Sequence, residues 1–285
     1  MTLPVFKDLN VLWELPENWC EWDHIGETLQ RVSHHLVNLG TADRFVFIVT
    51  SMGDQLPVAH SERTVVIQTS DEGHEIPSYA GDVFMVFKNY RPFDPAPENL
   101  RVIPLGCNKD VPDLALRSMP ERPVDIFFTG WDNHRESFFT AVDAAYPAGE
   151  GQLGGRDLTI DIGRQKDFRS GMKPEDYARR LAETKIALSP RGVSHETFRT
   201  YEAMRAGCIV IANRQLPAWY LDGWPVIELD DWQGFGKIVE DILGDEMRLQ
   251  DLSEQNRTWW QNYCSPEAVA HYVVRELSLK LMQGE

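Results

Sequence analysis

Short runs of hydrophobic residues recur along the chain, and most are followed by glycine, proline or small polar residues. Such runs are typical of strands in a parallel sheet that is covered on both faces. Strands are predicted over 11–13, 45–49, 64–68, 83–87, 100–104, 124–128, 158–162, 186–188, 208–212 and 225–229. Spacings of three and four predict helices over 25–39, from 133 onward, and over 173–183, 232–243, 247–261 and 268–282. Because strands and helices alternate, the pattern predicts an α/β fold.

The strands fall into two sets, and we interpret each set as a Rossmann-like domain. The chain has 285 residues, of which 42% are hydrophobic, enough for two cores. Residues 105–123 are rich in proline and polar side chains and are interpreted as a linker. We therefore expect an N-terminal domain over 1–118 and a C-terminal domain over 119–285. The last helix, 268–282, has a hydrophobic stripe that fits packing in its own domain or back against the first domain.

The segment 186–213 changes its pattern twice. Its first strand ends at Pro190 and Gly192, since proline has no amide donor and glycine adopts backbone angles that other residues avoid. A helix is predicted from Ser194 to Gly207, before the strand 208–212. The segment is therefore predicted to be a strand, a glycine turn, a helix and a second strand.

Polar residues gather at the start of this predicted helix. Ser194 and His195 lie where free backbone amides and the helix dipole favour an anion, and Arg191 lies in the loop just before them. The sequence therefore predicts a phosphate site here.

Three charged residues of the same helix, Glu196, Arg199 and Glu202, are spaced by three and share roughly one helical face. A carboxylate on that face can hold the paired hydroxyls of a ribose. A solvated ladder of ion pairs explains the same spacing, and for these three residues alone the two interpretations carry equal weight.

Two further groups follow predicted strands. Gly130 comes after the strand 124–128 and Arg135 opens the next helix, which again predicts an anion site. Asp71 and Glu72 follow the strand 64–68, where ligands collect in sheets of this kind. A carboxylate there can act as a general base, and an acidic loop that caps the next helix is the alternative.

The segment also contains several short motifs: Ser189-Pro190-Arg191-Gly192, Glu202-Ala203-Met204, Gly207-Cys208-Ile209 and the later Leu216-Pro217. Together they resemble the sugar-donor segment of exostosin-like and related glycosyltransferases of the GT-B fold. The resemblance covers about residues 125–232, and Ser70-Asp71-Glu72 is similar to a segment of the family's N-terminal domain. It implies two Rossmann-like domains that face a cleft.

The resemblance also implies roles for the candidate residues. A nucleotide-sugar donor would be bound by Gly130, Arg135, Arg191, Gly192, Ser194, His195, Glu196, Arg199 and Glu202. Asp71 or Glu72 would be the catalytic base, with Asp71 favoured and His74 or Glu14 next. Retaining enzymes of this fold often carry two glutamates separated by seven residues, but Ser194 occupies the position eight before Glu202. An inverting reaction is therefore mildly favoured.

Composition narrows the partners and the location. The net charge of −16 argues against a nucleic-acid partner, because phosphate backbones bind clustered lysine and arginine. The four cysteines form no CxxC pair and are interpreted as thiols, and no motif requires a metal or another cofactor. The sequence shows neither a signal peptide nor a run of eighteen hydrophobic residues, so we expect a cytoplasmic protein, with peripheral membrane association left open.

The sequence thus predicts a GT-B-type glycosyltransferase that moves a sugar from a nucleotide sugar to a hydroxyl of a saccharide or glycoconjugate, as in polysaccharide biosynthesis. Two alternatives stay open. One is a non-catalytic module of the same fold that binds a nucleotide or glycan, and the other is a nucleotide-sugar epimerase. Turnover of the donor separates the first from an enzyme, and product formation without an acceptor identifies the second.

Overall fold

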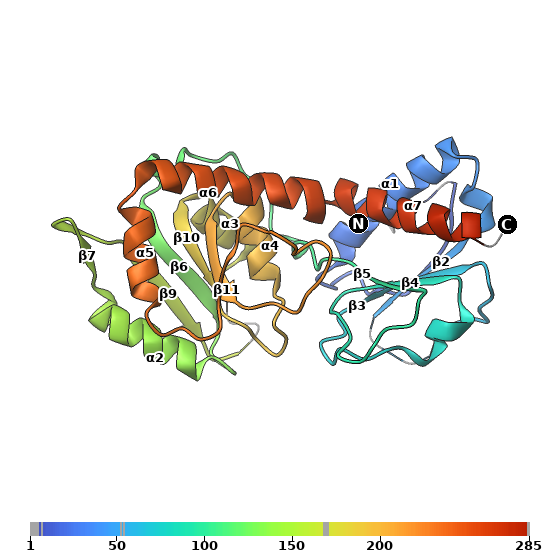
Figure 1. Ribbon diagram of the computed structural model, residues 1–285, viewed down its shortest axis with the longest axis horizontal. Coiled ribbons are helices and arrows are strands. Elements are labelled where there is room, and N and C mark those ends of the chain that lie inside the picture. Colours follow the sequence, from blue (N-terminus) through green and yellow to red (C-terminus); the bar gives the residue numbers. More distant parts are fainter. Residues whose placement is uncertain (1–5, 7, 52, 54, 168–170, 284–285) are drawn as a thin grey trace. The chain divides into compact units, whose positions relative to one another are not determined.

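The computed structural model describes residues 6, 8–51, 53, 55–167 and 171–283. The chain divides into two compact units (Figure 1). Unit 1 consists of Met1–Lys109, Pro217–Asp222 and Asn262–Glu285, and unit 2 consists of Asp110–Leu216 and Gly223–Gln261. The last helix, α7 (Pro266–Gln283), therefore belongs to unit 1 although it follows unit 2 in the sequence.

Unit 1 is built on a parallel sheet whose strands lie in the order of the sequence. The strands are β1 (Asn10–Trp13), β2 (Val46–Ser51), β3 (Thr64–Thr69), β4 (Met85–Lys88) and β5 (Leu100–Val102). All four pairings are parallel, so the carboxyl ends of the strands meet at one edge of the sheet.

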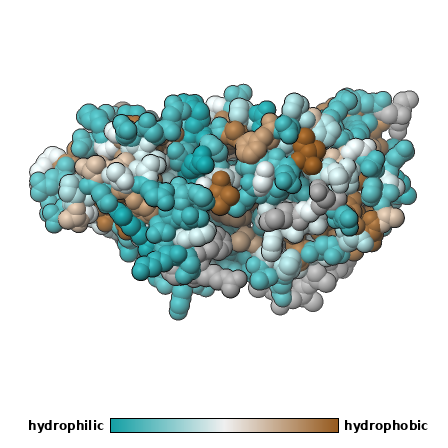
Figure 2. Space-filling view, turned by 90° about the horizontal axis from the view of Figure 1, so that it is seen from below, coloured by the Kyte–Doolittle hydropathy of each residue, from teal (hydrophilic) through white to brown (hydrophobic). Residues whose placement is uncertain are grey.

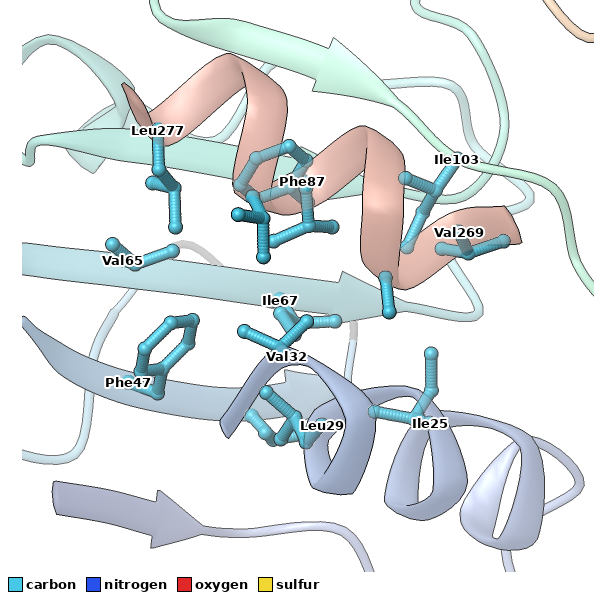
Figure 3. Close-up of a cluster of buried hydrophobic side chains, with 14 of the residues drawn as sticks. Ile25, Leu29, Val32, Phe47, Val65, Ile67, Phe87, Ile103, Val269 and Leu277 are labelled. Carbon is cyan, nitrogen blue, oxygen red and sulfur yellow. The ribbon is translucent and has the colours of Figure 1, made fainter. Parts of the chain in front are cut away.

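The two faces of this sheet are covered differently. Helices α1 (Trp22–Asn38) and α7 pack on one face, where Val65 and Ile67 of β3 contact them (Figure 3). The side chain between them, Val66, points to the other face, which is covered by the short 3-10 helix Ser78–Asp82 and neighbouring loops. Both faces of β3 are therefore buried, which explains its continuous hydrophobic run.

Unit 2 has a sheet in which the order of the strands reverses. Its parallel strands lie in the order β12 (Ile227–Leu229), β11 (Ile209–Asn213), β10 (Thr184–Ser189), β6 (Val124–Trp131) and β9 (Ile160–Gln165). Counted along the chain this is the doubly wound order 2-1-3-4-5, with the switch point between β6 and β10. Ligands of such sheets bind at the carboxyl ends of the strands beside the switch point.

Helices cover both faces of the unit 2 sheet (Figure 1). One face packs against α2 (Glu136–Ala145) and α5 (Phe235–Leu243), and the other against α3 (Pro174–Ala182) and α4 (Phe198–Arg205). Along β10 the side chains alternate, with Ile186 and Leu188 in the first core and Ala187 in the second. Helix α6 (Glu246–Trp259) adds Leu249 to the first core.

The α/β fold with two parallel sheets agrees with the sequence prediction, and several local features differ. The crossovers from β2 to β5 contain no α-helix in the described residues. A small hairpin, β7 (Gln152–Leu153) with β8 (Arg156–Asp157), was not predicted because its strands are too short to show a pattern. A π-helical turn, Trp260–Cys264, separates α6 from α7.

The face of the protein in Figure 2 is largely hydrophilic, with hydrophobic residues in small groups. Among the described residues, no helix is both long and apolar enough to cross a membrane. None of the four cysteines, all described, forms a disulfide: Cys107, Cys208 and Cys264 are buried and Cys20 is half-buried.

Candidate functional site

Arg199 and Gly130 meet at the switch point of unit 2. The Nε atom of Arg199, in the first turn of α4, donates a hydrogen bond of 2.7 Å to the backbone oxygen of Thr129 in β6. A Cβ atom on Gly130 would lie 2.5 Å from Nη2 of Arg199. Gly130 is thus required for the close approach of the guanidinium to the end of β6.

Arg135 joins the end of β6 to the loop after β10. Its Nη1 donates to the backbone oxygen of Trp131 at 2.5 Å, and its Nε donates to that of Pro190 at 3.4 Å. A Cβ atom on Gly192 would lie 3.0 Å from Nη2 of Arg135. The predicted anion-binding arginine therefore lies at the switch point, but it is 5% exposed and its donors bind backbone oxygens.

Arg191 is exposed and is held by His195. Its Nη1 lies 3.3 Å from Nε2 of His195, whose Nδ1 lies 2.9 Å from the backbone oxygen of Arg214. A guanidinium only donates and a carbonyl only accepts, so this chain requires the neutral imidazole with its proton on Nδ1. The backbone amide of Arg191 also donates to Oδ1 of Asn213 at 2.9 Å. Both the backbone and the side chain of Arg191 are thereby positioned.

Helix α4 begins later than predicted, at Phe198. Thr197 is the N-cap with an extended backbone, and its hydroxyl lies 3.0 Å from that of Ser189. The Ser189 hydroxyl also lies 2.8 Å from that of Thr200, so the end of β10 fixes the first turn of the helix. Ser194, which is 2% exposed, and His195 consequently lie in the loop before the helix and not in its first turn.

The two predicted ribose-binding glutamates occupy different environments. Glu196 precedes α4 and is half-buried, and the hydroxyl of Tyr201 donates to its Oε1 at 2.5 Å. Glu202 lies on α4, is 4% exposed and is hydrogen-bonded to Tyr177. Burial, together with the nearby Glu202, raises the pKa of Tyr177 well above its usual value, so its hydroxyl stays a donor. Of the three residues predicted to share a helical face, only Arg199 and Glu202 lie on α4.

In unit 1, Asp71 follows β3 and forms an ion pair with Lys88. The Nζ atom of Lys88 lies 2.6 Å from Oδ2 of Asp71 and donates to the backbone oxygen of Glu75 at 2.7 Å. The backbone amide of Glu75 donates to the same Oδ2 at 3.0 Å. Burial lowers the pKa of Lys88, although the hydrogen bond to Asp71 opposes this. Asp71 thus serves as counter-ion to a lysine whose side chain is fully buried.

The neighbouring Glu72 has a different environment. It is exposed, and Tyr90 contributes a long hydrogen bond of 3.5 Å from its hydroxyl to Oε1. His74 is buried, with Nδ1 2.7 Å from the backbone oxygen of Arg91 and its ring stacked on Phe93 at 4.3 Å. Of the two predicted bases, Glu72 is therefore the accessible carboxylate.

Sequence reasoning did not select Glu21 or Asn213. Glu21 is fully buried, accepts a 2.5 Å hydrogen bond from the hydroxyl of Ser70, and leaves its Oε2 without a hydrogen-bond partner. Burial raises the pKa of Glu21, although the Ser70 hydroxyl opposes the shift. Asn213 accepts from Trp232 Nε1 at 3.0 Å as well as from the amide of Arg191. Its place at the end of a strand was the available signal, whereas only the fold brings Glu21 to Ser70.

Comparisons with known proteins add the fold class. No protein-family model matches the chain, and no curated protein matches it in sequence. Among solved structures, sucrose-phosphate synthase from Thermosynechococcus elongatus is similar with a TM-score of 0.54 and 14% identity, over 95% of this chain and 81% of that one. AviGT4, a glycosyltransferase involved in avilamycin A biosynthesis, is similar with a TM-score of 0.50 and 13% identity, over 97% and 99%. The fold is therefore that of the GT-B glycosyltransferases, with two Rossmann-like units.

Proposed function

We propose that this protein is a GT-B glycosyltransferase that transfers a sugar from a nucleotide sugar to a hydroxyl of a saccharide or glycoconjugate acceptor. We further propose that the reaction inverts the anomeric centre and needs no metal ion, because arginines at the switch point neutralise the leaving diphosphate. The similar solved structures support the class of reaction at a coarse level.

The observation that carries the proposal is the exposed guanidinium of Arg191 beside the switch point of unit 2. Its side chain is held by His195 and its backbone by Asn213, so little conformational freedom is lost when an anion binds. Arginine suits a diphosphate because its planar donors bind two oxygens at once. Arg135 and Arg199 add positive charge at the end of β6 and the start of α4, and both donate hydrogen bonds to backbone oxygens of β6.

The environments of the two glutamates support different roles. Glu196 is half-buried, and the hydroxyl of Tyr201 orients its carboxylate. The carboxylate is therefore suited to accept a hydrogen bond from a hydroxyl of the nucleotide sugar. Glu202 was the predicted ribose ligand, but it is 4% exposed and bonded to Tyr177. We therefore assign the donor contact to Glu196 and a positioning role within unit 2 to Glu202.

For the catalytic base, the ion pair of Asp71 with Lys88 favours Glu72. A base must accept a proton, and Asp71 already compensates the charge of a fully buried lysine. Glu72 is exposed at the end of the same strand. We assign general-base catalysis to Glu72 and keep Asp71 as the competing candidate.

The experiment starts from a thermal-shift screen of nucleotide sugars, followed by calorimetry with the one that stabilises most. Arg191→Ala should weaken binding of that donor about 10- to 100-fold, the range for lost hydrogen bonds to a charged group, without loss of stability. The matched control, Arg179→Ala, removes an exposed arginine on α3 and should bind the donor normally.

Three outcomes would contradict the proposal. Normal donor binding by Arg191→Ala removes the assigned diphosphate site. Donor binding without any transfer or hydrolysis identifies a binding module, and an altered sugar nucleotide without acceptor identifies an epimerase.

Turnover in excess EDTA tests metal independence, and proton NMR of the product reads the anomeric configuration.

A further inference from the structure

Three side chains of unit 1 that have no part in the proposed reaction gather where α1 and α7 lie side by side. Figure 3 shows the two helices over the same sheet, with Leu29 and Val269 among the residues of the shared core. On the solvent side, His35 of α1 meets Glu267 and His271 of α7. Glu267 and His271 are one helical turn apart, so they point from one face of α7.

The three ligand atoms have the spacing of a metal site. Oε1 of Glu267 lies 3.1 Å from Nε2 of His35 and 3.2 Å from Nε2 of His271. Ligand atoms at about 2.0 Å around a tetrahedral zinc ion are about 3.3 Å apart. All three ligand atoms lie within 4.8 Å of one another, and in the described part of the chain no other group of three such residues does so.

We propose that His35, Glu267 and His271 bind a divalent transition metal ion, with zinc as the best fit, and that the ion fastens α7 to α1. Two imidazoles and one carboxylate form a ligand set that zinc accepts, with water in the fourth position. The side chains are 26%, 51% and 62% exposed, respectively, so an ion reaches them from solvent. The site is structural and lies outside the proposed donor site and base.

Arg31 acts as a positioning residue for this site. It lies one turn before His35 on α1, and its Nε contacts Oε2 of Glu267 at 3.1 Å. This contact occupies the second carboxylate oxygen and leaves Oε1 directed at the two histidines. Outer contacts of this kind orient metal ligands, and their loss typically weakens binding about 10- to 100-fold.

Two neutral imidazoles and one carboxylate around a divalent ion leave a net positive charge at the site, which the negatively charged protein tolerates.

The test is calorimetric titration of the EDTA-treated, dialysed full chain with Zn²⁺. We expect one ion per chain and a rise in the melting temperature of about 5 °C at a large excess of zinc over its dissociation constant. Co²⁺ should give the visible absorption bands of a low-symmetry nitrogen and oxygen site. His271→Ala and His35→Ala should each weaken binding at least as much as the loss of an outer contact, more than about 10-fold.

The matched control is His34→Ala, which removes the exposed neighbour of His35 that bonds to Asn38 and contacts no member of the site other than the ring of His35. This variant should bind zinc as the wild type does. The inference is overturned if the wild type shows no saturable zinc binding, or if His35→Ala and His271→Ala bind as the wild type does. His271 is largely exposed, so its replacement keeps the fold and the result stays interpretable.

Discussion

The two units end their parallel sheets in opposite ways. At the carboxyl edge of unit 1 the chain places three acidic residues, Glu21, Asp71 and Glu72, beside the end of β3. At the switch point of unit 2 it places Arg135 and Arg199 around the end of β6 and the start of α4, with Arg191 just after β10. One parallel five-stranded sheet thus has carboxylates at its carboxyl edge, and the other has guanidinium groups there.

The two sheets also differ in strand order. All strands of unit 2 are parallel, but their order in the sheet reverses between β6 and β10. The loops that follow these two strands therefore diverge. The strands of unit 1 follow in sequence order, so its loops stack in one direction without a switch point. Unit 2 therefore has a switch point at which a ligand can bind, whereas unit 1 carries its acidic side chains on the loop after β3.

The largest effect concerns the buried ion pair of unit 1. Lys88→Met should destabilise the protein by about 3–5 kcal/mol, because it leaves the carboxylate of Asp71 buried without its partner. Urea denaturation measures this loss, and addition of Asp71→Asn should recover part of it. Lys280→Met is the control, since Lys280 is half-buried and contacts the backbone oxygen and the ring of Phe84. Equal losses for the two lysines would show that Asp71 is not held as a counter-ion.

The next effect separates the two candidate bases. Glu72→Gln should reduce turnover roughly 10²-fold, the scale for a positioned base, while the affinity for the donor stays unchanged. Steady-state kinetics and calorimetry measure the two quantities. Glu75→Gln, an exposed glutamate of the same loop, should turn over normally. If Glu72→Gln is fully active and a folded Asp71→Asn is inactive, the base is Asp71 and the assignment made here is wrong.

A smaller effect tests the guanidinium side of the comparison. Gly130→Ala places a Cβ 2.5 Å from Arg199, so the guanidinium must move and donor affinity should fall about 10-fold. Gly163→Ala on β9 is an equally crowded control, with its Cβ 2.7 Å from Oγ1 of Thr129. Both variants should lose similar stability in thermal melts. A similar loss of donor affinity in both would indicate a general disturbance of β6 and not a role for Arg199.

The sequence predicted the sheets well because buried parallel strands carry continuous hydrophobic runs. The run 64–68 became β3 (Thr64–Thr69), and the run 208–212 became β11 (Ile209–Asn213). The start of α4 was predicted too early, since Ser194 resembles an N-cap in sequence while the hydroxyls of Ser189 and Thr197 select a later start. Periodicity does not reveal such side-chain contacts between a strand and the start of a helix.

The sequence selected the candidate residues one by one, but it did not predict which residues they contact. Spacing placed Asp71 after a strand, and only the fold shows that Lys88, seventeen residues later, neutralises it. Likewise, spacing by three suggested one face for Glu196 and Glu202, but Glu196 lies before the helix. The roles assigned to these residues stay predictions until variants are measured.

The smallest effect concerns the buried Glu21 and is a test by pH. Burial raises the folded-state pKa of this carboxyl above its usual value of 4.5, so the folded protein binds the proton more tightly than the unfolded chain does. The stability that Glu21 contributes is therefore fully present below pH 4.5 and is lost as the pH rises through the folded pKa. Glu21→Gln removes this loss and should be more stable than the wild type at pH 7 by roughly 1 kcal/mol, with little difference at pH 4. Urea denaturation at both pH values gives the comparison, with the exposed Glu14→Gln as control. A constant difference between Glu21→Gln and the wild type across this range would mean that burial does not hold Glu21 in its protonated form.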